Sequence, residues 1–263
     1  MFALPRTFLA LLSIGYYLAL DFSSMSWPAA IPIVLLLVSG FAASQQTLQF
    51  GRYVGHGLFI ILALTLATHW WPDFYNGPII ATQRFTDDAV PFTMYANLDK
   101  PLIGFWLLLV CPWLVGRRSF RSILFATALA LPLSAVLALG GALLLGVVAW
   151  APKWPDAAWF WLLNNLLLVT LVEEALFRGY IQSGLSRWLK NLRHGENFAL
   201  LLASLIFGLA HAGAGWQWVL LASLAGIGYG LAYRFGGLTA AIATHFGLNL
   251  LHFGLFTYPM LAS

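Results

Sequence analysis

Residues 159–178 read WFWLLNNLLLVTLVEEALFR, an apolar run that ends in two adjacent glutamates and, one turn later, an arginine. An ionisable side chain at membrane depth costs about 2.5–3.5 kcal/mol on insertion scales, so it is functional by default. Glu173 and Glu174 are two of only three glutamates in the 263-residue chain. We therefore expect a membrane-spanning helix here, and we expect the chemistry of the protein to centre on it.

The rest of the chain has the same apolar character. Its residues are 61% hydrophobic and 8% charged, against about 25% charged residues in an ordinary globular domain. Apolar stretches of about 20 residues, the length that crosses a bilayer, recur along it. This composition predicts an all-α, polytopic bundle of transmembrane helices with about eight or nine spans. The candidate spans lie near residues 6–22, 28–44, 55–71, 101–115, 122–150, 157–188, 198–213, 216–233 and 237–257.

Two further patterns bear on the organisation of the chain. Arg6 before an apolar run resembles a signal peptide, but no cleavage site follows, so we expect 6–22 to be the first span. The single cysteine, Cys111, excludes an internal disulfide and a multi-cysteine metal site. We divide the chain into residues 1–150, helices without an assigned motif, and residues 151–263, the expected catalytic core.

The basic residues are distributed unevenly between the predicted loops. With the N-terminus inside and nine spans, ten of the thirteen Lys and Arg residues fall on the inner side, and all six aspartates fall outside. This is the positive-inside bias, so the net charge of +4 indicates topology and anionic lipid headgroups rather than a nucleic-acid partner. We expect a multi-pass protein of a prokaryotic plasma (inner) membrane with a cytoplasmic N-terminus. The polar segment 72–100 then lies outside, as a solvated loop, a lid or a docking surface.

A row of polar side chains follows the helix that carries the glutamates. Its members are four residues apart and share one face: Thr170, Glu174, Arg178, Gln182 and Ser186. Glu174 and Arg178 are spaced to form an ion pair, which leaves Glu173 less compensated and suited to act as a general base. The alternative is a charged pair that only fixes helix packing.

Two histidine motifs follow on later apolar helices. His211 ends the run Phe207-Gly208-Leu209-Ala210-His211, and His245 stands four residues before Asn249, with His252 on the same face. At about 1.5 Å rise per residue, Glu173, His211 and His245 lie roughly 14–20 Å from the inner ends of their helices. Because this is one slab of the membrane, we expect a single site. The small residues of the intervening span are expected to allow close helix packing; these are Ala222, Gly226, Gly228 and Gly230.

The ordered set Glu173-Glu174-x-x-x-Arg178, Phe207-x-x-x-His211 and His245-x-x-x-Asn249 resembles the CPBP family over about residues 159–256. This family comprises CAAX proteases and bacteriocin-processing enzymes related to the Rce1-type prenyl-protein endopeptidase. The resemblance implies that Glu173 and His211 activate a water molecule and that His245 and Asn249 bind the oxyanion. It further implies that Glu174 and Arg178 support the site, and that no metal or cofactor takes part. Zinc held by Glu173, His211 and His245 remains a chemical alternative.

We therefore expect an intramembrane endopeptidase of the glutamate type, a hydrolase that cuts a membrane-associated protein or peptide. Two alternatives stay open: a non-proteolytic immunity or scaffold member of the same family, and a proton-coupled carrier that uses the Glu/His cluster as a relay. The sequence contains no HExxH, GxGD or GxSG motif of the other intramembrane protease chemistries. No pattern specifies the substrate or an oligomeric state.

Overall fold

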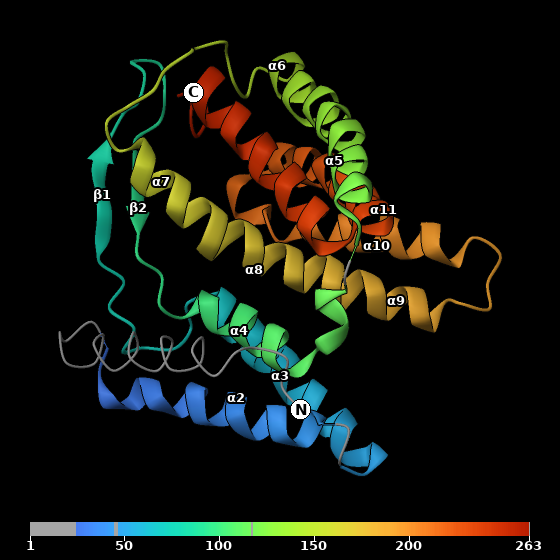
Figure 1. Ribbon diagram of the computed structural model, residues 1–263. Helices are drawn as coiled ribbons and strands as arrows, with labels where there is room; N and C mark the ends of the chain where they lie inside the picture. Colours follow the sequence, from blue (N-terminus) through green and yellow to red (C-terminus); the bar gives the residue numbers. More distant parts are fainter. Residues whose placement is uncertain (1–24, 45–46, 117, 263) are drawn as a thin grey trace. The chain divides into compact units, whose positions relative to one another are not determined.

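The protein is described by a computed structural model that covers residues 25–44, 47–116 and 118–262 and is mostly helical (Figure 1). The predicted first span, 6–22, lies outside these described residues. The described chain forms two compact units, one from the residues up to Pro78 with Tyr95–Pro112, the other from Ile79–Met94 and from Trp113 onward. The proposed division of the chain at residue 150 stays a prediction.

The described residues of the first unit form one short 3-10 turn and three helices: η1 (Trp27–Ala29), α2 (Ala30–Ala43), α3 (Gln49–Ala67) and α4 (Lys100–Val110). Trp106 of α4 ties these helices together. Its indole stacks on Phe59 of α3 at 3.8 Å between ring centres, and its Nε1 donates to the Leu36 carbonyl and the Ser39 hydroxyl of α2. A buried indole N–H needs such a partner, so the tryptophan fixes the packing of all three helices.

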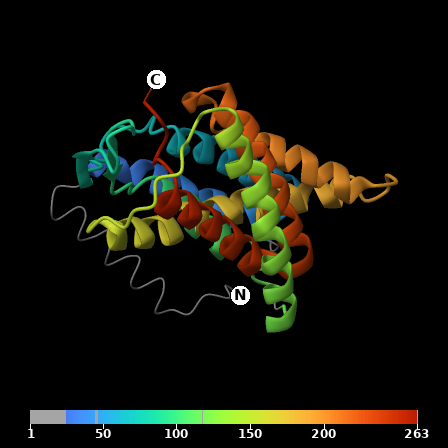
Figure 2. The same cartoon turned by 90° about the horizontal axis from the view of Figure 1, so that it is seen from above.

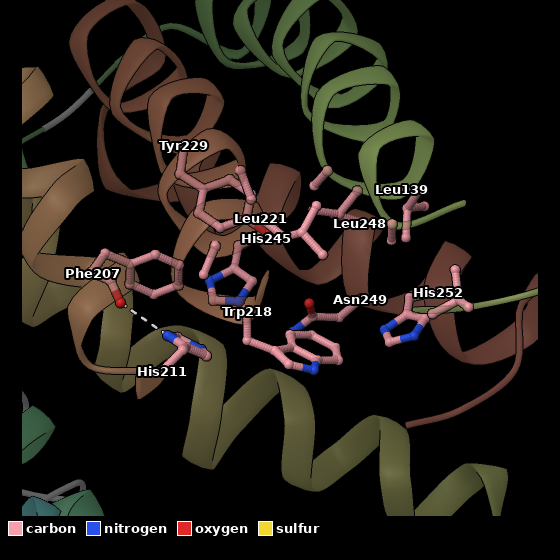
Figure 3. A pocket seen from close by; sticks show the side chains of 15 residues that line it. Leu139, Phe207, His211, Trp218, Leu221, Tyr229, His245, Leu248, Asn249 and His252 are labelled. Carbon is pink, nitrogen blue, oxygen red and sulfur yellow. Dashed lines mark hydrogen bonds between the residues drawn. The ribbon is translucent and has the colours of Figure 1, made fainter. Parts of the chain in front are cut away.

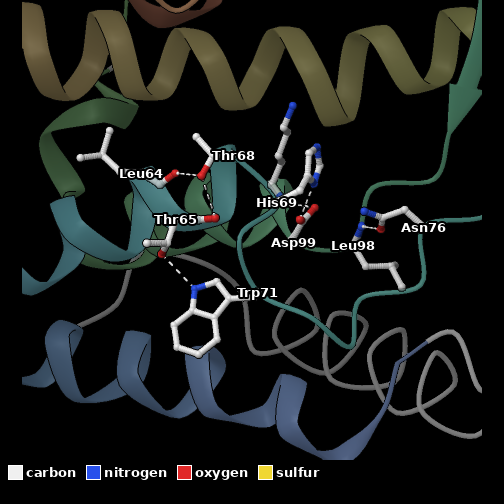
Figure 4. A network of polar contacts seen from close by, with 9 residues as sticks. Leu64, Thr65, Thr68, His69, Trp71, Asn76, Leu98 and Asp99 are labelled. Atoms are coloured by element: carbon white, nitrogen blue, oxygen red, sulfur yellow. Dashed lines mark hydrogen bonds and ion pairs between the residues drawn. The ribbon is translucent and has the colours of Figure 1, made fainter.

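One end of this unit carries a small polar network (Figure 4). The Asp99 carboxylate accepts from the backbone N–H of Lys100 at the start of α4 and from His69 Nδ1, at 2.9 and 2.5 Å. Asp99 is only 1% exposed, whereas the His69 side chain is 41% exposed. The Asp99 carboxylate therefore caps the start of α4 and holds His69.

The second unit begins with two strands, which is a departure from the expected all-helical class. β1 (Pro78–Gln83) and β2 (Phe92–Tyr95) pair as a two-stranded sheet and run in opposite directions (Figure 1). Ile80 and Met94 are buried against Trp161 and Phe253. The segment 72–100 is therefore not a plain solvated loop, because it contains a hairpin in which each strand buries one residue.

The remaining elements of the second unit are helical, and several join end to end. They are η2 (Pro112–Val115), α5 (Phe120–Ser134), η3 (Ala135–Gly140), α6 (Gly141–Leu144), α7 (Ala158–Asn164), η4 (Asn165–Thr170), α8 (Leu171–Glu174), η5 (Ala175–Gln182), α9 (Ser183–Trp188), α10 (Gly195–Leu209), η6 (Ala212–Ala214) and α11 (Trp216–Leu255). The segments η3, η4 and η5 are π-helical. Residues 120–144 and 158–188 thus form two long helices with π turns inside them. Such turns are rare and often mark functional sites.

The last helix, α11, reverses direction at Gly237. This glycine has φ +73° and ψ −168°, a conformation that L side chains rarely adopt. Tyr229 and His245, which would stand about 24 Å apart in a straight helix, stack at 4.4 Å between ring centres. The element is therefore a helical hairpin with arms 216–236 and 238–255, which agrees with the predicted spans 216–233 and 237–257.

Small residues let the arms of α11 approach their neighbours, as the sequence predicts. A Cβ atom on Gly228 would lie 1.9 Å from the Ser134 hydroxyl oxygen, and one on Gly226 would lie 3.2 Å from Arg178 Nη2. Helix α5 runs along α11 in this unit (Figure 2). Any larger side chain at Gly228 would separate the two helices.

Four described helices are long and apolar enough to cross a membrane: Gln49–Ala67, Phe120–Leu144, Ala158–Trp188 and Trp216–Leu255. Three shorter apolar helices match the predicted spans near 28–44, 101–115 and 198–213: Trp27–Ala43, Lys100–Val110 and Gly195–Leu209. The prediction of a polytopic helical membrane protein is confirmed. The count of eight or nine spans stays a prediction, because the shorter helices do not reach the length of a spanning segment.

Candidate active site

A pocket in the second unit gathers the residues of the two histidine motifs singled out in the sequence. It is bounded by η3 and α6, the end of α10 and both arms of α11, and it holds about 540 Å³ of empty space, part of it open to the outside. Ala138, Ala142, Leu221, Ala225 and Leu248 make its walls largely apolar. The polar side chains in its lining are His211, Tyr229, His245, Asn249 and His252.

These polar side chains converge from different elements (Figure 3). His211 follows the C-terminal end of α10, whereas His245, Asn249 and His252 come from the second arm of α11. The positions 245, 249 and 252 share one helical face because they are four and three residues apart. The predicted convergence of the two histidine motifs is therefore present, and His252 joins them.

The hydrogen bond of His211 defines which nitrogen faces the pocket. Its Nδ1 lies 2.9 Å from the backbone carbonyl oxygen of Phe207. A carbonyl only accepts, so Nδ1 carries the proton, and in the neutral ring Nε2 is the atom with the free lone pair. This tautomer gives the pocket a proton acceptor.

Glu174 joins Arg178 and His245 in a buried chain of contacts. The carboxylate is fully buried, with Oε2 at 3.3 Å from Arg178 Nε and Oε1 at 2.9 Å from His245 Nδ1. The predicted ion pair between Glu174 and Arg178 is thus present. The contact between Glu174 and His245 links the helix of the glutamates to the hairpin, and it places the proton of the neutral His245 ring on Nδ1.

Aromatic rings surround this chain of contacts. The His245 ring stacks on Tyr229 at an interplanar angle of 13°, and Phe207 meets it edge-on at 5.7 Å. The Arg178 guanidinium carbon lies 5.3 Å from the centre of the Phe207 ring and 5.9 Å from that of Tyr229. Cation–π contacts of this kind offset part of the desolvation of a buried guanidinium. Its two Nη atoms have no hydrogen-bond partner among the described residues.

Asn249 belongs to a second polar chain. Its Nδ2 donates to Asn165 Oδ1 at 3.2 Å, and the Thr170 hydroxyl donates to the same oxygen at 3.3 Å. Asn165 is 8% exposed and Thr170 is fully buried. Sequence reasoning missed Asn165, although an amide in the middle of the run 159–178 is a signal of function in a membrane helix.

Glu173 has a different environment from Glu174. It is half-buried and is not among the residues that line the pocket. Within the described chain no hydrogen bond or ion pair engages its carboxylate, although its charge acts on Arg178 and Tyr229. Glu173 is therefore the less compensated of the two glutamates, as the sequence predicts.

The candidate zinc ligands Glu173, His211 and His245 do not form a metal site in the described ranges. No group of three or more His, Cys, Asp or Glu side chains there is placed to hold a metal ion. The expectation that no metal takes part stays a prediction.

Comparison with known proteins identifies the segment that carries this site. Residues 154–251 match the family model of type II CAAX prenyl endopeptidases of the Rce1-like kind. This segment is similar to an Rce1-like domain. The matched residues include Glu173, Glu174, Arg178, His211, His245 and Asn249, so the family resemblance seen in the motifs is confirmed. Neither a curated protein nor a solved structure matches the chain.

The domain and the apolar helices together place the protein in its broad class. Rce1-like proteins are prenyl endopeptidases, and four described helices have the length and composition of membrane spans. The chain is therefore an integral membrane protein that contains a domain of a protease family. A protease of this class implies a protein substrate within or at the membrane.

Proposed function

We propose that the protein is an intramembrane endopeptidase that hydrolyses a peptide bond of a membrane-associated protein or peptide. The observation that carries this proposal is a largely apolar pocket lined by His211 and His245. In each ring Nδ1 is already hydrogen-bonded, to the Phe207 carbonyl in His211 and to the Glu174 carboxylate in His245. Nε2 is therefore the nitrogen of each ring that remains for a hydrogen bond or a proton transfer with the substrate or water. An apolar wall that limits water strengthens every polar interaction inside such a site.

In the proposed mechanism, Glu173 and His211 activate the hydrolytic water. The water oxygen attacks the carbonyl carbon of the scissile bond, and its proton passes to His211 Nε2 or to the Glu173 carboxylate. The same proton then reaches the amine nitrogen as the carbon–nitrogen bond breaks. The lone pair on His211 Nε2 supports this assignment. The Glu173 carboxylate has no ion-pair partner in the described chain, which leaves its oxygens free to accept a hydrogen bond from the hydrolytic water.

His245 and Asn249 would donate hydrogen bonds to the oxyanion of the tetrahedral intermediate. Because His245 Nδ1 is engaged by Glu174, Nε2 donates only when the ring is protonated. The proposed donor role therefore requires the doubly protonated ring, whose positive charge would face the Glu174 carboxylate at 2.9 Å.

The surroundings of the site bear on how the substrate arrives. We propose the inner membrane of a prokaryote. We place the N-terminus on the cytoplasmic side because, with nine spans, ten of the thirteen Lys and Arg residues would then lie on that side. The substrate would then enter laterally from the bilayer or from the cytoplasmic side. In a bacterial chain a peptide or a surface protein's sorting tail suits this site better than a prenylated protein, since prenylated partners would be lacking.

The test is cleavage of a library of membrane-anchored peptides by the purified protein, with products identified by mass spectrometry. We expect the wild type to cut a subset, and Glu173→Gln or His211→Ala to lower the rate about 10²–10⁴-fold, the range for loss of a general acid–base group. Glu196→Gln, a change at an exposed surface pair, serves as the control. A folded Glu173→Gln variant that cuts at the wild-type rate would show that water activation is assigned to the wrong residue.

A further inference from the structure

Asn165 stands behind the pocket rather than in its lining. It belongs to η4, on the helix that carries the glutamates, and its Oδ1 accepts two hydrogen bonds, from Thr170 and from Asn249. A carbonyl-type oxygen has two lone pairs, so both are used. Asn165 Oδ1 therefore has no acceptor capacity left for a substrate, and its hydrogen bond with Asn249 connects Asn165 to the pocket lining.

The π-helical geometry of η4 brings Asn165 and Thr170 together. They are five residues apart, which is the hydrogen-bond spacing of a π turn. In a regular α-helix the neighbours of Thr170 on its own face would be three and four residues away, at Leu167 and Leu166. The wider turn replaces these leucines by an amide and thereby gives the Asn165 side chain a fixed partner inside its own helix.

We propose that Asn165, held by Thr170, is a positioning residue that orients the side-chain amide of Asn249 for the oxyanion. The NH₂ group of Asn249 is planar and has two N–H bonds. With one of them directed at Asn165, rotation of the amide is restricted, and the second points away from Asn165 on the side of the pocket that Asn249 lines. A donor that is already oriented needs no reorganisation when the oxyanion forms.

This inference rests on the proposed function, because it assumes that Asn249 donates a hydrogen bond to the oxyanion. It predicts an effect on the chemical step rather than on binding. Asn165→Leu keeps the size of the side chain but removes both polar atoms. Asn165→Asp keeps an acceptor for Thr170 and Asn249, so the aspartate should restore most of the activity. Thr170→Val, which removes one hydroxyl at nearly constant volume, should have a smaller effect of the same kind.

The experiment uses the full-length protein and a membrane-anchored peptide that the wild type cuts. We expect Asn165→Leu to lower kcat about 10–100-fold, less than the roughly 10²–10³-fold loss for removing an oxyanion donor itself. KM should change by no more than about threefold, since ground-state binding is untouched. The matched control is Asn164→Leu, which removes the neighbouring half-buried amide, for which the described residues provide no hydrogen bond.

A double mutant separates positioning from general damage to the fold. If Asn165 acts through Asn249, Asn165→Leu with Asn249→Ala should be no slower than Asn249→Ala alone. Three results would each overturn the inference. The first is a double mutant whose loss in kcat equals the product of the two single losses. The others are a wild-type kcat for Asn165→Leu, and an Asn165→Asp variant as slow as Asn165→Leu. If Asn165→Leu does not fold, the variants Thr170→Val and Asn165→Asp test the inference instead. A several-fold lower kcat for Thr170→Val, together with an active Asn165→Asp variant, supports the inference. A fully active valine variant or an inactive aspartate overturns it.

The Asn249→Ala variant distinguishes failure of the proposed mechanism from failure of the positioning role. If Asn249→Ala cuts at the wild-type rate, Asn249 is not an oxyanion donor, and the proposed mechanism fails whatever Asn165 does. If Asn249→Ala is slow while Asn165→Leu is not, the mechanism stands and only the positioning role is wrong.

Discussion

Replacing Glu174 by glutamine should destabilise the protein more than any other single removal of charge at the site. The carboxylate is fully buried and accepts from Arg178 Nε at 3.3 Å and from His245 Nδ1 at 2.9 Å. Glutamine has nearly the same shape, but its NH₂ group cannot accept, so one donor loses its partner. More importantly, Arg178 stays buried without its counter-charge.

The size of the effect follows from that uncompensated charge. Removing one partner of a buried ion pair costs about 3–5 kcal/mol, whereas removing both partners costs much less than the sum. At about 2–4 °C per kcal/mol for a chain approaching this size, Glu174→Gln should lower Tm by roughly 6–20 °C. Adding Arg178→Met should recover part of that loss.

The assay is thermal unfolding in detergent at one scan rate, because membrane proteins of this kind often unfold irreversibly and their Tm depends on the rate. Glu196→Gln is the matched control. Its partner Arg234 lies at 2.6 Å, but the two side chains are 66% and 36% exposed, so the pair contributes only about 0–1 kcal/mol. Equal shifts for Glu174→Gln and Glu196→Gln, or a Glu174→Gln variant within about 2 °C of the wild type, would refute the reasoning.

Three other predictions concern pH, metal and topology. Burial raises the pKa of Tyr258 to about 12 from its ordinary 10, so the folded state retains a proton that the unfolded state loses, and stability should fall as pH rises from 10 toward 12. Thermal scans across that range should show a shallower fall for Tyr258→Phe, and equal slopes would contradict the assignment. Purified protein should contain no stoichiometric zinc and should resist chelators, and zinc whose removal abolishes cleavage would reverse this expectation. Single cysteines introduced within 72–100 should react with an impermeant reagent from outside and those within 187–193 only from inside, with buried Cys111 as the silent background. The opposite labelling pattern would contradict the proposed orientation.

Several features of the site were readable from local pattern alone. Hydropathy is summed along the chain, so the membrane class followed from composition, and the family followed from the spacing of the glutamates and histidines. The ion pair of Glu174 with Arg178 was also predictable, because four-residue spacing on one helix places two side chains together whatever the rest of the fold does. The same argument placed His245, Asn249 and His252 on one face.

The four-residue spacing of a regular α-helix failed to predict side-chain contacts where the helix contains a π turn. Asn165 is five residues before Thr170 and so falls off the row of polar residues that four-residue spacing selects. Only the π turn aligns the two side chains, and nothing in the residue types of 165–170 announces that turn. The hairpin in 78–95 was missed for a related reason. Its strands are short, and their buried residues, Ile80 and Met94, are covered by side chains that are distant in the sequence.

The sequence by itself determined the class of protein, the family of residues 154–251 and the residue types available for chemistry. The tertiary structure alone decided which glutamate holds His245 and which residue orients Asn249. The adjacent carboxylates of Glu173 and Glu174 differ in sequence only by position, but their side chains point about 100° apart around the helix. The hairpin at Gly237 brings His245 against just one of them. Contacts between helices depend on how the chain reverses and crosses, which no local spacing encodes.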